Sequence, residues 1–141
     1  MIEIRADEDD RPITADGPHN SERTRAVAAG IDAAFRLLNY ATMSTNGLTY
    51  PSDVYSVLGE LSSAVSKLPQ ALRQMTEFID GQVTSGRARE HPNYGRYGGD
   101  ADAAARALAS VTREASDAAT NLGRLLSEAQ STVGGLEAAE H

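Results

Sequence analysis

A run of basic and aromatic side chains between two helical stretches holds the residues with the clearest chemical potential in this chain. The run reads GRAREHPNYGRYGGD over residues 86–100, and its candidate contact residues are Arg87, Arg89, His91, Tyr94, Arg96 and Tyr97. Arg and Tyr are favoured binding anchors because they bury a large contact area while keeping hydrogen-bonding groups. Structureless loops longer than about 12–15 residues are uncommon unless they are functional or disordered. We therefore predict that this loop binds a partner. The simpler interpretation, a connecting turn with solvated charges, stays open.

Other kinds of chemistry find less support along the chain. The stretch GRYGGD resembles a glycine-rich turn that feeds a helix N-terminus and can bind phosphate. No Lys-Ser or Lys-Thr follows it, and Asp100 and Asp102 would repel an anion. The three histidines, His19, His91 and His141, form no catalytic pair with a carboxylate and no metal-ligand spacing. We therefore expect no enzymatic activity, no cofactor and no metal.

The composition limits the classes of partner. The 141 residues carry a net charge of −7, which weakens non-specific binding to nucleic acid and to anionic membranes. The absence of cysteine excludes disulfides and thiolate metal sites. The charged N-terminus does not resemble a signal peptide, and no run approaches the roughly 20 apolar residues that span a bilayer. We expect a cytoplasmic protein that binds no membrane, and we expect nucleic acid to be an unlikely partner.

The first 20 residues read as a disordered acidic tail. They combine six acidic side chains with the breakers Pro12, Gly17 and Pro18, and they hold too few apolar side chains to offset the entropy of ordering. An alternative is an acidic arm that docks on a basic partner or folds back on the basic loop.

Three amphipathic helices follow. The first is expected over residues 21–43, capped by Asn20 or Ser21. The second begins at Pro51, and its apolar seam continues without a change of phase through Pro69. We predict a kink near Leu68, with two shorter helices meeting at Pro69 as the alternative. The third runs from the N-cap Asp100 to Gly134-Gly135.

Apolar residues alternate at spacings of four and three along the two longer helices. In the second helix they are Val54, Leu58, Leu61, Val65, Leu68, Leu72, Met75 and Ile79. In the third they are Ala104, Leu108, Val111, Ala115, Ala118, Leu122, Leu125 and Ala129, with Ala105, Ala119, Leu126 and Val133 beside them. Large residues opposite small ones let two helices approach closely.

These patterns predict an all-α fold: an antiparallel helical hairpin of two long helices plus a shorter N-terminal helix packed along it as a three-helix bundle. We expect a single domain over residues 21–136 with a long loop over 84–99, and a polar tail over 137–141. A second apolar stripe, Val57, Ala64, Ala71 and Phe78, lies beside the seam of the second helix, and its burial in a homodimer is a further possibility.

Two stretches carry a resemblance to known proteins. LTYPSDVYSVLGELSSAVSKLPQALRQMTEFID and HPNYGRYGGDADAAARAL resemble an uncharacterised group of small helical proteins encoded by actinobacteria. The resemblance implies an intracellular bacterial protein from an accessory or mobile gene cluster, and it carries over no activity. The chain is also similar in size and hairpin shape to the WXG100 family of secreted proteins. It lacks Trp, and none of its tyrosines has Asp or Glu four residues later, so that family's turn and secretion signal are missing.

We therefore predict a non-enzymatic interaction or adaptor protein that binds a protein partner, one with an acidic surface, through the basic loop. The alternatives are a nucleic-acid-associated accessory factor that uses the same loop, a ligand-binding bundle with a pocket near Pro69, and a WXG100-like secreted hairpin.

Overall fold

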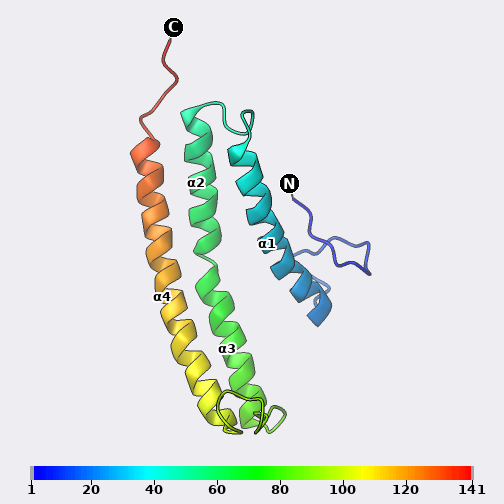
Figure 1. Cartoon of the computed structure of the whole chain (residues 1–141). Coiled ribbons are helices and arrows are strands. Elements are labelled where there is room, and N and C mark those ends of the chain that lie inside the picture. The colour runs from blue at the N-terminus through cyan, green and yellow to red at the C-terminus, as the bar shows by residue number, and fades with distance from the viewer. Residues whose placement is uncertain (1, 141) are drawn as a thin grey trace. The chain divides into compact units, whose positions relative to one another are not determined.

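The computed structural model describes residues 2–140 and confirms the all-α fold class. Its helices in chain order are α1 (Ser21–Met43), α2 (Pro51–Val65), α3 (Leu68–Thr84) and α4 (Ala101–Val133), as Figure 1 shows. The chain divides into two compact units between Thr49 and Tyr50. This division differs from the expected single domain over 21–136, because α1 groups with the N-terminal segment.

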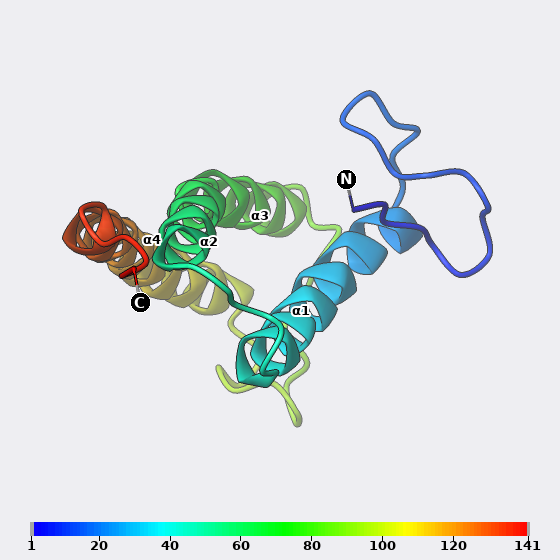
Figure 2. The same cartoon turned by 90° about the horizontal axis from the view of Figure 1, so that it is seen from above.

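The second unit is an antiparallel helical hairpin. In it α2 and α3 follow one another, and α4 returns alongside both (Figures 1 and 2). Local signals start α2 and α4 as the sequence predicts. Pro51 occupies the first turn of α2, and the Asp53 carboxylate accepts the Tyr50 N–H at 2.8 Å. The Asp100 carboxylate caps α4 by accepting the Ala103 N–H at 3.0 Å.

Pro69 divides the predicted second helix into α2 and α3. A proline cannot donate to the carbonyl four residues earlier, and its ring clashes with that carbonyl. The residue four positions before Pro69 is Val65, where α2 ends. Lys67 then donates its side-chain ammonium to the Ser63 carbonyl oxygen at 3.1 Å. The helix is therefore interrupted for two residues, while α3 continues the course of α2 along α4 (Figure 1).

The most buried side chains of α4, where it contacts the α2–α3 pair, are small. Ala105 and Ala119 of α4 are buried. Hydroxyl groups meet across the contact: Thr76 and Thr112 lie 2.9 Å apart, and the Ser62 hydroxyl donates to the Gly123 carbonyl oxygen at 3.1 Å. The close contact thus follows the Ala105 and Ala119 stripe. The neighbouring α4 seam through Val111 and Leu122 is about half exposed, so the expected seam lies beside the helix contact.

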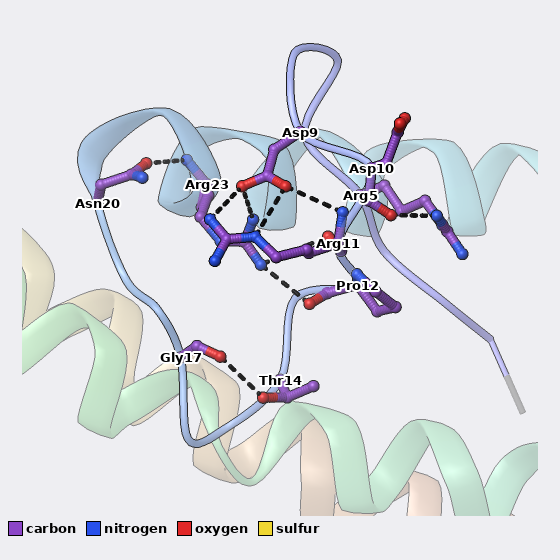
Figure 3. Close-up of polar contacts among 9 residues, drawn as sticks. All are labelled: Arg5, Asp9, Asp10, Arg11, Pro12, Thr14, Gly17, Asn20 and Arg23. Atoms are coloured by element: carbon purple, nitrogen blue, oxygen red, sulfur yellow. Dashed lines mark hydrogen bonds and ion pairs between the residues drawn. The ribbon is translucent and has the colours of Figure 1, made fainter.

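The first unit consists of α1 and the N-terminal segment, which folds around one arginine (Figure 3). The Arg23 side chain is 1% exposed and pairs with Asp9, whose carboxylate oxygen lies 2.7 Å from Nη1. Its Nη2 donates to the Pro12 carbonyl oxygen at 2.9 Å. Ile13 donates its N–H to the Ile4 carbonyl oxygen at 2.8 Å, which closes the segment into a loop. We call this arrangement of Asp9, Pro12 and Arg23 the clasp.

The clasp differs from the expected disordered tail and has a clear physical reason. Repulsion among the acidic residues does not keep this segment extended, because Asp9 is paired with two arginines. Arg11 donates to the Asp9 carboxylate from Nη2 at 2.9 Å and from Nε at 3.1 Å, while Arg23 binds it from α1. Asn20 separately caps α1 by accepting the Arg23 N–H at 2.9 Å.

The charge of Asp9 gives the clasp a defined pH dependence. Hydrogen bonds from the Arg11 side chain and backbone hold the pKa of the Asp9 carboxyl well below its ordinary value of 3.8, with the positive charges of Arg11 and Arg23 adding to the effect. Because the pKa is lowered in the folded state, this carboxylate stabilises the clasp fully above about pH 4, and the contribution is lost as the pH falls further.

We therefore expect the Asp9 carboxyl to remain ionised in NMR titrations down to pH values where free aspartate is largely protonated. The Ile13 amide resonance should keep its folded position between about pH 7 and pH 4, the range above the ordinary pKa. The Asp9→Asn variant should show a displaced Ile13 resonance throughout. A carboxyl that titrates with the ordinary aspartate pKa would contradict the pairing.

Candidate functional site

The basic loop joins α3 to α4 at one end of the hairpin (Figure 1). It leaves α3 through a glycine turn in which Arg87 donates its N–H to the Gln82 carbonyl oxygen at 2.9 Å and Gly86 donates to Val83 at 3.1 Å. This pair of bonds is a Schellman motif, which needs a left-handed residue after the helix end. Gly86 supplies it with φ of 75°. The direction in which the loop departs from the helix is thereby fixed.

The side chains of Glu90 and His91 organise the loop from inside. The half-buried Glu90 carboxylate accepts the Tyr97 N–H at 2.9 Å, across seven residues. His91 Nδ1 accepts the N–H groups of Asn93 at 3.1 Å and Tyr94 at 3.2 Å. Gly95 passes so close to the Glu90 carboxylate and the His91 carbonyl that a Cβ at this position would collide with both. The hydrogen bonds of Glu90 and His91 therefore form a framework that holds the loop backbone in place.

This framework presents five of the six predicted residues to solvent. Tyr94 is 88% exposed, and Arg87, Arg89, His91 and Arg96 are also exposed. The Tyr94 ring rests against the His91 ring, with 4.6 Å between the centroids. Most of the Tyr94 side chain is therefore open to solvent.

The six predicted residues differ in exposure and in the bonds that they make within the loop. Tyr97 is half-buried, and the Arg96 guanidinium lies 5.9 Å from its ring centroid. His91 combines an exposed ring with its backbone hydrogen bonds. Sequence reasoning missed Glu90 as a framework residue, because its partner lies seven residues away. The only signal was a single carboxylate inside a run of arginines.

The phosphate-binding interpretation of GRYGGD gains nothing from this geometry. Gly98 and Gly99 have positive φ values of 62° and 97°. The N-terminus of α4 that they lead to is already capped by the Asp100 carboxylate, and Asp102 lies in the first turn. An anion approaching this end would meet two negative charges.

Two grooves lie elsewhere in the described residues. The larger, about 860 Å³, lies within the first unit between residues 2–7 and α1, and alanines of α1 form much of its wall. The smaller, about 370 Å³, lies between α3 and α4 and includes Pro69, near the pocket expected at the kink. Polar residues such as Arg73, Glu77 and Arg113 line it.

No group of three or more potential metal ligands occurs among residues 2–140. Within the same residues, none of the helices has both the length and the apolar character needed to cross a bilayer.

Comparison with protein families, with curated proteins and with solved structures finds no match to this chain. The chemistry and geometry of the basic loop are therefore the basis on which a function can be proposed.

Proposed function

We propose that this protein is a non-enzymatic binding module of the cytoplasm that docks on a protein partner through the basic loop. The observation that carries the proposal is the exposure of Tyr94 and three arginines on a loop whose backbone is held from inside by Glu90 and His91. A preorganised loop loses little conformational freedom when it binds.

The exposed groups define the chemistry of the partner. Arginine donates several N–H groups in a fixed planar fork that matches carboxylates, so Arg87, Arg89 and Arg96 suit an acidic surface. Tyr94 supplies an aromatic ring for an apolar pocket within that surface. Glu90, the carboxylate that lies between Arg87 and Arg96 in the sequence, accepts a hydrogen bond from the loop backbone and so competes less for these arginines.

The loop should lose its partner when its exposed side chains are truncated. We expect the combined variant Arg87→Ala, Arg89→Ala, Tyr94→Ala and Arg96→Ala to lower capture from an extract of the source organism by roughly 100-fold, as expected for removal of several interface anchors. The measurement is a quantitative pull-down with the purified wild-type chain as bait. Far-UV circular dichroism first establishes that both baits have the same helix content.

A matched control removes the same side-chain types from the helices of the hairpin. Its substitutions are Arg106→Ala, Arg113→Ala, Arg124→Ala and Tyr55→Ala. This variant should capture the partner as well as the wild type does. Equal capture by the loop variant and the wild type would overturn the proposal. Capture that disappears with nuclease and weakens steeply with salt would instead favour the nucleic-acid-associated accessory factor.

A further inference from the structure

The hairpin leaves a broad apolar face open. Six large apolar side chains of α3 and α4 are between 44% and 63% exposed, namely Leu68, Met75, Phe78, Val111, Leu122 and Leu125. We call this surface the apolar face. It is separate from the basic loop, and it is made by the same heptad pattern that would normally form a core.

Helix geometry places both halves of this surface on one side of the hairpin. On α3, Met75 immediately precedes Thr76, which contacts α4; on α4, Val111 immediately precedes Thr112, which contacts α3. One residue step turns about 100° around a helix. In each helix the apolar stripe lies one residue before the position that contacts the other helix. Because the two helices run antiparallel, this shared offset places both stripes on the same side of the hairpin.

The opposite side of the hairpin is polar. Gln70 of α3 follows Pro69 by one position, and Thr120 of α4 follows the buried Ala119 by one position; both are exposed. The same geometry therefore places these two residues on the side away from the apolar face. The hairpin has one apolar and one polar open side, which is the pattern of half of a larger bundle.

The hairpin has almost no core of its own. Among the hydrophobic residues of the hairpin that the structure describes, only Ala105 and Ala119 are buried. Packing of apolar faces supplies most of the stability of helices in proteins, and two buried alanines supply little of it. Other large apolar side chains of the hairpin, such as Leu58, Leu72 and Leu126, are only half-buried.

We propose that the apolar face is covered by the apolar face of a second copy of this chain, forming a four-helix bundle with two-fold symmetry. With full Leu, Met and Phe residues presenting roughly 150–200 Å², the six residues leave on the order of 600 Å² open per copy, and flanking alanines bring this near the roughly 800 Å² per partner of a stable interface. This is at or above the largest patch of an ordinary monomer, about 300–600 Å².

The shape of the apolar face suits a second copy. Large and small residues alternate on both helices of this face. Ala71 lies between Leu68 and Met75 on α3, and the exposed Ala115 and Ala118 lie between Val111 and Leu122 on α4. Since Thr76 lies level with Thr112 in the hairpin, the two alanines of α4 lie level with the stretch between Leu68 and Met75. A two-fold axis along the hairpin sets each α3 over the partner's α4, so the alanines of the two copies lie at the same level and let the helices approach closely there.

Sedimentation equilibrium of the full chain tests this proposal. The wild type is expected at twice the monomer mass of 14.9 kDa, with dissociation on dilution. Its melting temperature should rise with protein concentration, because association stabilises the folded chain by mass action. A wild type that remains monomeric up to millimolar concentration overturns the proposal, whatever else covers the apolar face.

Charged substitutions locate the interface. The double variant Met75→Glu, Leu122→Glu should weaken self-association by roughly 100-fold, because burying unpaired carboxylates is costly. The matched double variant Gln70→Glu, Thr120→Glu adds the same two charges to the polar side of the same helices and should dimerise like the wild type. Equal effects of the two double variants, with helix content unchanged, would show that another surface associates. Because the apolar face is distinct from the loop, the loop variant described above should still dimerise.

Discussion

Replacing Ala119 with leucine should lower the free energy of unfolding by about 1–3 kcal/mol, the usual cost of overpacking a close contact. Ala119 is 6% exposed and lies on the stripe of α4 that contacts the α2–α3 pair. The hydroxyl contacts along that stripe, including the 2.9 Å contact between Thr76 and Thr112, hold the helices too close for a larger side chain. We expect the helices to separate locally and these hydroxyl contacts to break. Urea denaturation followed by far-UV circular dichroism measures the loss.

The control for this change is Thr120→Leu, one residue later on the exposed polar side of α4. This substitution adds side-chain bulk outside the helix contact. The free energy of unfolding should therefore stay within about 0.5 kcal/mol of the wild-type value. Equal losses from the two substitutions would mean that Ala119 is not at a close helix–helix contact.

Replacing Arg23 with methionine should release the N-terminal segment from α1. Methionine keeps much of the aliphatic volume but removes the guanidinium that binds the Asp9 carboxylate and the Pro12 carbonyl oxygen. Arg23 Nε has no acceptor among the described residues, so the cluster already carries one unpaired donor. Loss of the remaining bonds removes the polar contacts between Asp9 and α1.

We expect the amide of Ile13, which donates to the Ile4 carbonyl oxygen, to exchange with solvent on the order of 100-fold faster in Arg23→Met. Hydrogen exchange followed by NMR measures this rate directly. The control is Arg36→Met, which removes an exposed arginine from the same helix and should leave the rate unchanged. An Ile13 amide that is equally protected in wild type and Arg23→Met would mean that Arg23 does not hold the segment.

The two proposed surfaces give the hairpin separate tasks. The apolar face would join two copies, and the basic loop at the end of each hairpin would remain free for a partner. A dimer would then present two loops, which raises the effective affinity for a partner that carries two matching sites.

The sequence by itself determined the helices and their ends, because these depend on neighbouring residues. Asn20 and Asp100 cap helices as predicted, and Pro51 starts one. The sequence placed an irregularity at Pro69, expected as a kink with two shorter helices as the alternative, because the proline removes one hydrogen bond and blocks one carbonyl. The structure has the two helices. The basic, tyrosine-bearing loop was likewise identified from residue types and length alone.

Only the tertiary structure decided which stripe of α4 makes the helix contact. Apolar periodicity marks a face about 100° wide, and both the Val111 stripe and the neighbouring Ala119 stripe lie within it. The choice depends on how closely the helices approach, and alanine allows the closest approach. The pairing of Asp9 with Arg23 and of Glu90 with Tyr97 was also invisible, because these contacts span 14 and 7 residues along chain segments without a regular period.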